Sequence, residues 1–174
     1  MDSFTGACVS PPPADPVVAP GGGGGGGGGA GNGTETAKLG VVQILSQQND
    51  CSDWLNKAAD QMSGGILGSA AQIFDSTPLL LEVTDTNSMA RTKQGSINYP
   101  ILVNLNGAFF PGHGSGTPIG GVYQPGSTPA QITILLHEMA HKLNAIPRDS
   151  VSSSQSIENT KTVLQHCEAA INGD

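Results

Sequence analysis

The sequence predicts a small α+β domain, and three segments carry this prediction. Residues 129–145 repeat apolar side chains at the three- and four-residue spacing of a helix that packs on a core. Residues 96–105 alternate apolar and polar side chains, which is the period of a half-buried strand. Residues 157–170 return to helical spacing and predict a C-terminal helix with one broad apolar face. We therefore expect two long helices packed with a short sheet that has an exposed edge strand.

The start and end of the helix at 129–145 are marked by particular residues. Thr128 is expected to be its N-cap, Pro129 suits the first helical position, and Gln131 completes a capping box. Pro147 disfavours helical geometry in the residue before it, so the helix should end at about residue 145.

The segment 96–105 predicts a strand at the edge of the sheet. Pro100 has no N–H to donate to a neighbouring strand, and a sheet tolerates proline mainly at its edges. An edge strand could bind an extended peptide as an additional strand. An edge strand without any ligand is an equally good interpretation.

The remaining elements are shorter. In chain order we expect a helix or a strand at 39–45, helices at 52–63 and 66–74, a strand at 79–83, and a long loop at 111–128. Ser156 is expected to be the N-cap of the C-terminal helix.

Residues 1–36 differ in composition from the rest of the chain. They contain Pro11–Pro13 and nine consecutive glycines, Gly21–Gly29, with almost no large apolar side chain. Such a segment cannot bury enough surface to offset the entropy lost on ordering. We therefore expect a disordered Pro/Gly-rich tether at 1–36 and one folded domain at 37–174. The tether would connect the domain to a larger protein, or the chain would be a free monomer.

Charge and composition exclude several classes of function. The net charge is −7 with only seven lysines and arginines, so nucleic acid is not an expected partner. No apolar run approaches the length of a membrane span, and the N-terminus lacks the pattern of a signal peptide. The scarcity of lysine beside abundant serine, threonine, asparagine and glycine favours an extracellular or cell-surface protein.

Three cysteines are present, and two of them flank the expected domain. Cys8 lies in the tether, Cys51 precedes the first helix of the domain, and Cys167 lies in the last helix. A Cys51–Cys167 disulfide would close a loop of more than 100 residues and stabilise the fold by about 4–5 kcal/mol in the chain-entropy model. Two buried thiols are the alternative interpretation, and we favour the disulfide.

The residues His137 to His141 read His-Glu-Met-Ala-His, an H-E-x-x-H pentad on the predicted helix. Positions four apart lie on one helical face, so the two imidazoles can bind one Zn²⁺ ion. Glu138 projects about 100° further round and could act as a base toward a metal-activated water. A surface helix with two hydrogen-bonded histidines is the alternative interpretation.

The pentad resembles the active-site motif of the zincin metallopeptidases, whose subtypes differ in the third zinc ligand. The metzincin pattern fails, because Asn144 and Pro147 stand where that subtype has glycine and a third ligand. The gluzincin pattern requires a glutamate on a later helix, where Glu158 is the candidate. By helical geometry, however, Glu158 should face solvent near Lys161.

Asp149 is the favoured third ligand. It follows Pro147 by two residues, where the chain turns back and a short carboxylate becomes available beside His141. In this respect the chain is similar to the aspartate-type zincins. Glu158, His113 and His166 stay open as alternatives, and Asp149 could also be an ordinary turn residue.

The resemblance implies a zinc-dependent endopeptidase that acts on a peptide or protein substrate, with His137, His141 and Asp149 as ligands of Zn²⁺. Glu138 would be the general base, and Tyr123 or His113 could assist the oxyanion. More faintly, residues 107–110 with the loop, pentad and final helix resemble peptidase domains at the C-termini of bacterial surface and RHS-repeat proteins. The hypothesis from another class is a non-catalytic, metal-containing binding or adhesion module.

Overall fold

The structure, a computed structural model, describes residues 5–9, 30–84, 88–113, 116–149 and 153–174. Within these ranges it contains five helices and one four-stranded sheet, so the predicted α+β class is confirmed. The sheet order is β1 (Thr5–Val9), β3 (Ser88–Thr92), β4 (Ile101–Asn104) and β2 (Leu79–Glu82). The pairs β1–β3 and β3–β4 are antiparallel, whereas β2–β4 is parallel.

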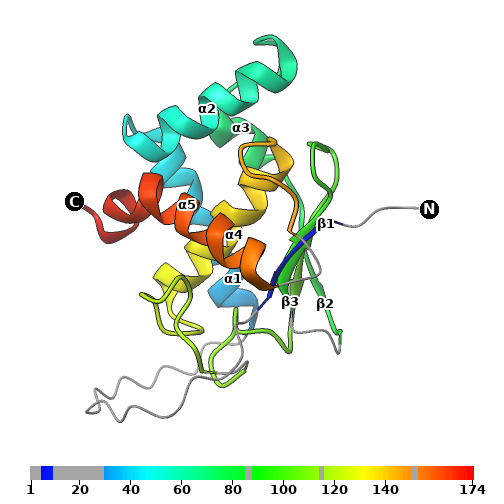
Figure 1. The fold of residues 1–174 in the computed structure, drawn as a ribbon, viewed down its shortest axis with the longest axis vertical. Coiled ribbons are helices and arrows are strands. Elements are labelled where there is room, and N and C mark those ends of the chain that lie inside the picture. The colour runs from blue at the N-terminus through cyan, green and yellow to red at the C-terminus, as the bar shows by residue number, and fades with distance from the viewer. Residues whose placement is uncertain (1–4, 10–29, 85–87, 114–115, 150–152) are drawn as a thin grey trace.

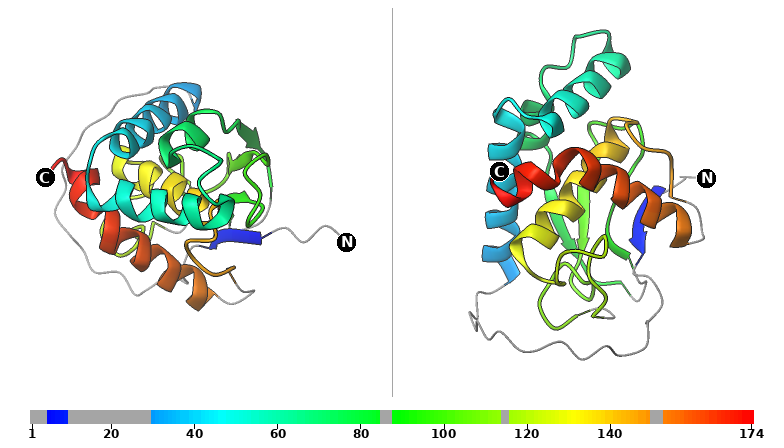
Figure 2. Two further views of the ribbon diagram at one scale, coloured as in Figure 1. Left: turned by 90° about the horizontal axis from the view of Figure 1, so that it is seen from above. Right: turned by 60° about the vertical axis from the view of Figure 1, so that its left-hand side comes forward.

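The helix that carries the pentad lies at the centre of the molecule. The helices are α1 (Ala30–Ser46), α2 (Asp50–Ser63), α3 (Ala70–Asp75), α4 (Thr128–Lys142) and α5 (Ser153–Asn172). Helix α4 packs between α1 and α5 and also contacts β3 (Figures 1 and 2). Every α4 residue from Ala130 to Lys142 is buried, so the pentad is enclosed on all sides of its helix. Among the described residues, no helix is long and apolar enough to cross a membrane.

Helix α1 resolves the ambiguity of residues 39–45, which are helical. It lies very close to α4, because a Cβ added at Gly40 would come within 2.7 Å of Ile132 Cδ1. Both β1 and the first residues of α1 fall inside the segment 1–36 that we predicted to be a tether. Residues 1–4 and 10–29 lie outside the described residues, so the tether stays a prediction for them.

The predicted capping of α4 is wrong. Ser127, not Thr128, is the N-cap, and its hydroxyl accepts a hydrogen bond from the backbone N–H of Ala130. The Gln131 side chain is buried and donates to the Phe109 carbonyl at 2.9 Å instead of completing a capping box. Serine and threonine are both common N-cap residues, so the sequence pattern alone does not decide between two neighbouring positions. The helix ends before Pro147, as expected, and Asn144 follows with a left-handed φ of 54°.

The prediction of an edge strand at 96–105 is also wrong. Only Ile101–Asn104 forms a strand, β4, and it lies between β3 and β2. Pro100 precedes this strand, so its missing N–H disturbs no ladder. The edge strands are β1 and β2, and in β2 the side chains of Leu80 and Leu81 are 49% and 44% exposed.

The ends of the domain are joined as predicted. Cys51 of α2 and Cys167 of α5 form a disulfide with an S–S distance of 2.02 Å. Helix α5 begins at Ser153, however, so the prediction of Ser156 as its N-cap is wrong, and Ser156 lies buried within the first turns. The helix predicted at 66–74 is shorter and begins at Ala70, because Ser69 caps it.

Candidate metal centre

His137, His141 and Asp149 lie together as a buried group that could hold a metal ion. The two histidines lie one turn apart on α4, and Asp149 lies on the segment that follows this helix. The His137 Nε2 atom lies 3.0 Å from His141 Nε2 and 3.3 Å from Asp149 Oδ2. The His141 Nε2 atom lies 3.4 Å from Asp149 Oδ1.

These distances fit a small tetrahedral ion. Zn²⁺ binds nitrogen and carboxylate oxygen at about 2.0–2.2 Å, so its ligand atoms lie about 3.3–3.6 Å apart. The three contacts of the group, 3.0 to 3.4 Å, are close to this range. Two unprotonated imidazole nitrogens repel one another at 3.0 Å unless a proton or a cation lies between them. Two imidazole nitrogens and one carboxylate therefore fit a divalent ion that accepts both nitrogen and oxygen ligands.

Asp149 is held in place by Asn159 of α5. The Asn159 amide donates both to Asp149 Oδ1 and to the Pro147 carbonyl, and Asn159 is itself buried. One side chain thus ties the turn after α4 and the carboxylate to the same helix. This arrangement fixes Asp149 before any metal binds.

His137 is oriented by Thr160, the next residue of α5. The Thr160 hydroxyl donates its hydrogen to the Ser156 carbonyl at 2.9 Å, so toward His137 it acts as an acceptor. The distance from His137 Nδ1 to Thr160 Oγ1 is 3.1 Å, which places the ring proton on Nδ1. The Nε2 lone pair is therefore directed at His141 and Asp149. Such supporting hydrogen bonds are typical of histidine metal ligands.

The charge states of the group favour metal binding. Burial lowers the pKa of His137, which keeps the imidazole neutral, although Asp149 opposes this shift. Burial alone would raise the pKa of Asp149, but the neighbouring His137 and His141 imidazoles outweigh this effect and hold the pKa well below its usual value. Neutral imidazole and ionised carboxylate are the forms that bind a cation. Among the described residues, the buried His141 Nδ1 atom has no hydrogen-bond partner.

Glu138 and Lys142 are two further buried ionisable residues on α4. The Lys142 ammonium donates to the carbonyls of Ser96 and Tyr99, which ties α4 to the turn before β4. Burial lowers the pKa of Lys142 to about 8, and the Glu138 carboxylate partly offsets this effect. Glu138 therefore lies in a low-dielectric environment with a cationic neighbour one turn away.

The other residues considered from the sequence lie apart from the group. Glu158 is exposed and forms an ion pair with Lys161 at 2.7 Å, as its helical position predicted. His166 stacks on Trp54 with ring centroids 4.6 Å apart, and His113 is exposed. The Tyr123 hydroxyl bonds to Asn172 Oδ1 at 2.9 Å, so Tyr123 packs against the end of α5.

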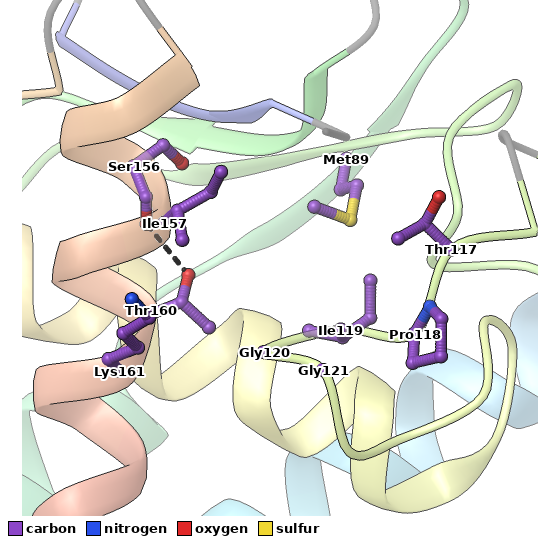
Figure 3. Close-up of a pocket in the computed structure, with 10 residues that line it drawn as sticks. All are labelled: Met89, Thr117, Pro118, Ile119, Gly120, Gly121, Ser156, Ile157, Thr160 and Lys161. Atoms are coloured by element: carbon purple, nitrogen blue, oxygen red, sulfur yellow. Dashed lines mark hydrogen bonds between the residues drawn. The ribbon is translucent and has the colours of Figure 1, made fainter. Parts of the chain in front are cut away.

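A cavity of about 280 Å³ adjoins the group on the side of α5 (Figure 3). Thr160 lines it, and the same side chain bonds to His137. Figure 3 shows the first turns of α5 on one side of the cavity and Met89 and the loop 117–121 on the other. Its surface is mostly apolar.

Sequence reasoning missed Asn159 and Thr160. Both are buried polar residues on α5. Thr160 lies on the face of the predicted helix that is otherwise apolar, and this exception was the available signal. Comparisons with protein-family models, with curated proteins and with solved structures found no match to the chain. The geometry of the group therefore carries the functional argument.

Proposed function

We propose that this protein is a zinc-dependent endopeptidase with His137, His141 and Asp149 as the metal ligands. The observation that carries the proposal is the 3.0–3.4 Å spacing of three buried ligand atoms on an H-E-x-x-H helix. Three protein ligands leave one position of a tetrahedral ion open, which is the arrangement of catalytic zinc sites. A bound Zn²⁺ supplies Lewis acidity, which activates water and polarises a scissile carbonyl.

Glu138 is the proposed general base. It follows the first histidine directly and is buried on the same helix as the two histidine ligands, within one turn of the proposed metal. It accepts the proton of the attacking water and then delivers it to the leaving amine. Substrate orientation would come from backbone and side-chain groups around the cavity.

Zinc is proposed over other cations because two imidazoles and one carboxylate are its usual ligands. An extracellular or cell-surface location is proposed on the Cys51–Cys167 disulfide, which requires an oxidising compartment. The faint resemblance to peptidase domains of bacterial surface and RHS-repeat proteins agrees with this location.

A second function is favoured by one observation. His137, Glu138 and His141 are fully buried, so in this conformation a peptide substrate has no access to them. The second candidate is therefore a non-catalytic, metal-containing binding or adhesion module. A buried glutamate beside the ligands has no purpose in such a site, and for this reason we prefer the peptidase.

The substitution Glu138→Gln separates the two functions, and Glu158→Gln is its matched control. Glu138→Gln is expected to keep the fold and to bind one zinc ion while losing nearly all hydrolysis of an unstructured protein such as casein. Glu158→Gln changes the same group on an exposed surface and should leave hydrolysis unchanged. If the zinc-loaded wild type cleaves nothing, or if Glu138→Gln keeps full turnover, the peptidase mechanism is rejected.

A further inference from the structure

Strand β1 comes from far away in the sequence to lie beside the helices that carry and support the metal-binding group. It pairs with β3 and contacts both α4 and α5, the helices that carry the two histidines and their supporting residues. Figures 1 and 2 show β1 along β3, next to the first turns of α5. Twenty residues, 10–29, separate β1 from α1, and nine of them are the consecutive glycines. The N-terminal segment thus packs against both helices that carry residues of the candidate site.

The pairing of β1 is less regular than that of the other edge of the sheet. Its partners are Thr5 with Thr92, Ala7 with Arg91 and Val9 with Ser88, with a shift of register between successive pairs. The pairing of β2 with β4 runs through four consecutive residues without a shift. A five-residue strand at the end of a long, glycine-rich connection is also opposed by the entropy of closing that loop. These features are those of a strand that can leave the sheet.

The candidate site is buried, so a peptide can reach it only if some part of the surrounding fold moves. His137, Glu138 and His141 have no exposed surface, and Asp149 is only 8% exposed. Departure of β1 would leave β3 with an unpaired edge beside α4 and α5. An unpaired edge offers a row of N–H and C=O groups to an extended peptide.

The cavity lies against the same two elements. Met89 of β3 lines it on one side, and Ile157 and Thr160 of α5 line it on the other (Figure 3). Its volume of about 280 Å³ lies just below the range of pockets that hold whole drug-sized ligands. It therefore suits a single apolar side chain. A peptide paired with β3 has alternate side chains directed to one face, where such a pocket can select among them.

We propose that the β3 edge and this cavity form a binding site for an extended peptide segment with an apolar side chain, and that Thr5–Val9 occupies the β3 edge of this site within the same chain. The identification of that peptide as a substrate rests on the proposed peptidase function. The binding of the peptide does not depend on it. An incoming peptide competes with β1, which is part of the same chain and therefore acts at an effective concentration of about a millimolar.

The test uses the full chain with Ala7→Pro, which removes a backbone N–H from the middle of β1. Ala14→Pro is the matched control, because it makes the same change outside β1. The probe is a fluorescein-labelled peptide of residues 4–10 with Cys8→Ser, followed by fluorescence anisotropy. Ala7→Pro should bind the probe at least ten-fold more tightly than the wild type, and Ala14→Pro should bind it like the wild type.

A second measurement covers the case in which Ala7→Pro unfolds the protein. A site for a specific protease is inserted into Gly21–Gly29 and cut, which turns the contact of β1 into one between two separate chains. The N-terminal piece should then leave on gel filtration, and the folded remainder should bind the probe. Retention of the piece, or a remainder that unfolds or ignores the probe, overturns the proposal by making β1 a permanent strand.

The experiment measures peptide binding and not hydrolysis, so it tests the peptide-binding site separately from the peptidase function. Probe binding by a protein that cleaves nothing would support the peptide site and reject only the peptidase. Hydrolysis of casein with no gain of binding or of rate in Ala7→Pro would reject the peptide site and leave the peptidase standing.

Discussion

Replacing Thr160 with valine should weaken zinc binding by a specific amount. Valine has nearly the shape of threonine but offers no acceptor to the His137 Nδ1–H, which lies 3.1 Å from Thr160 Oγ1. In the metal-bound protein the Nε2 atom is occupied, so the proton must stay on Nδ1 and lose its partner. In the metal-free protein the proton can move to Nε2, where Asp149 Oδ2 accepts it from 3.3 Å. The free-energy cost of losing this hydrogen bond therefore falls almost wholly on the metal-bound protein.

The size of this effect follows from the penalty for a buried, unsatisfied donor. That penalty is about 1–3 kcal/mol, which corresponds to a loss of affinity of about 5- to 150-fold. The range agrees with the roughly 10- to 100-fold effect of removing hydrogen bonds that support metal ligands. His137 is fully buried, so water cannot replace the lost acceptor.

The assay is competition for zinc against a chelator of known affinity. Thr162→Val is the matched control, because Thr162 also donates to a carbonyl four residues earlier on α5 but lies away from the metal group. Thr160→Ser restores the hydroxyl and should recover most of the affinity. If Thr160→Val binds zinc as tightly as Thr162→Val does, the assignment of the His137 tautomer and of Nε2 as the ligand atom is refuted.

Three further predictions concern the ligand set, the disulfide and a buried amine. Asp149→Ala should lose zinc in the same competition while Glu158→Ala keeps it, and the reverse result would transfer the third ligand to Glu158. Replacing both Cys51 and Cys167 with alanine should lower the free energy of unfolding by about 5 kcal/mol, the value that the chain-entropy model gives for a separation of 116 residues. An unchanged midpoint of urea unfolding would contradict this prediction. The pKa of Lys142 is about 8 in the folded protein and 10.5 in the unfolded chain. Between these two pH values the unfolded state binds more protons than the folded state. The free energy of unfolding should therefore rise with pH across this window, by up to about 3 kcal/mol. Lys142→Met in the zinc-free protein should abolish this rise. If the urea midpoints of the wild type and of Lys142→Met depend equally on pH, the prediction is refuted.

The central helix and the meeting of its histidines could be predicted because the information is local. Spacing along α4 places His137 and His141 on one face whatever the rest of the fold does. Pro147 forces the chain to leave the helix, so a carboxylate soon afterwards stays within reach. The disulfide was also predictable, because two cysteines in helices at opposite ends of a small domain have few other partners.

The remaining features depend on contacts between distant segments. Pro100 suggested an edge, but the ladder begins one residue later, and nothing local says which strands flank β4. Strand β3 has the sequence Ser-Met-Ala-Arg-Thr, which lacks the β-branched pattern of a strand. Strand β1 lies in a segment whose composition predicts disorder, and only its partner β3 makes it a strand. Asn159 and Thr160 acquire their roles only when α5 packs against α4.

The disulfide has a consequence for the order in which the protein matures. Cys167 lies two helical turns beyond Thr160, so the bond to Cys51 anchors the helix that also holds Asp149 and His137 in position. In a reducing compartment α5 is held only by packing and hydrogen bonds, and the supports of the metal group are correspondingly looser. Oxidation of the two thiols tightens them. A metal ion would then bind more weakly in a reducing compartment than in an oxidising one, so metal loading would follow disulfide formation as the protein matures.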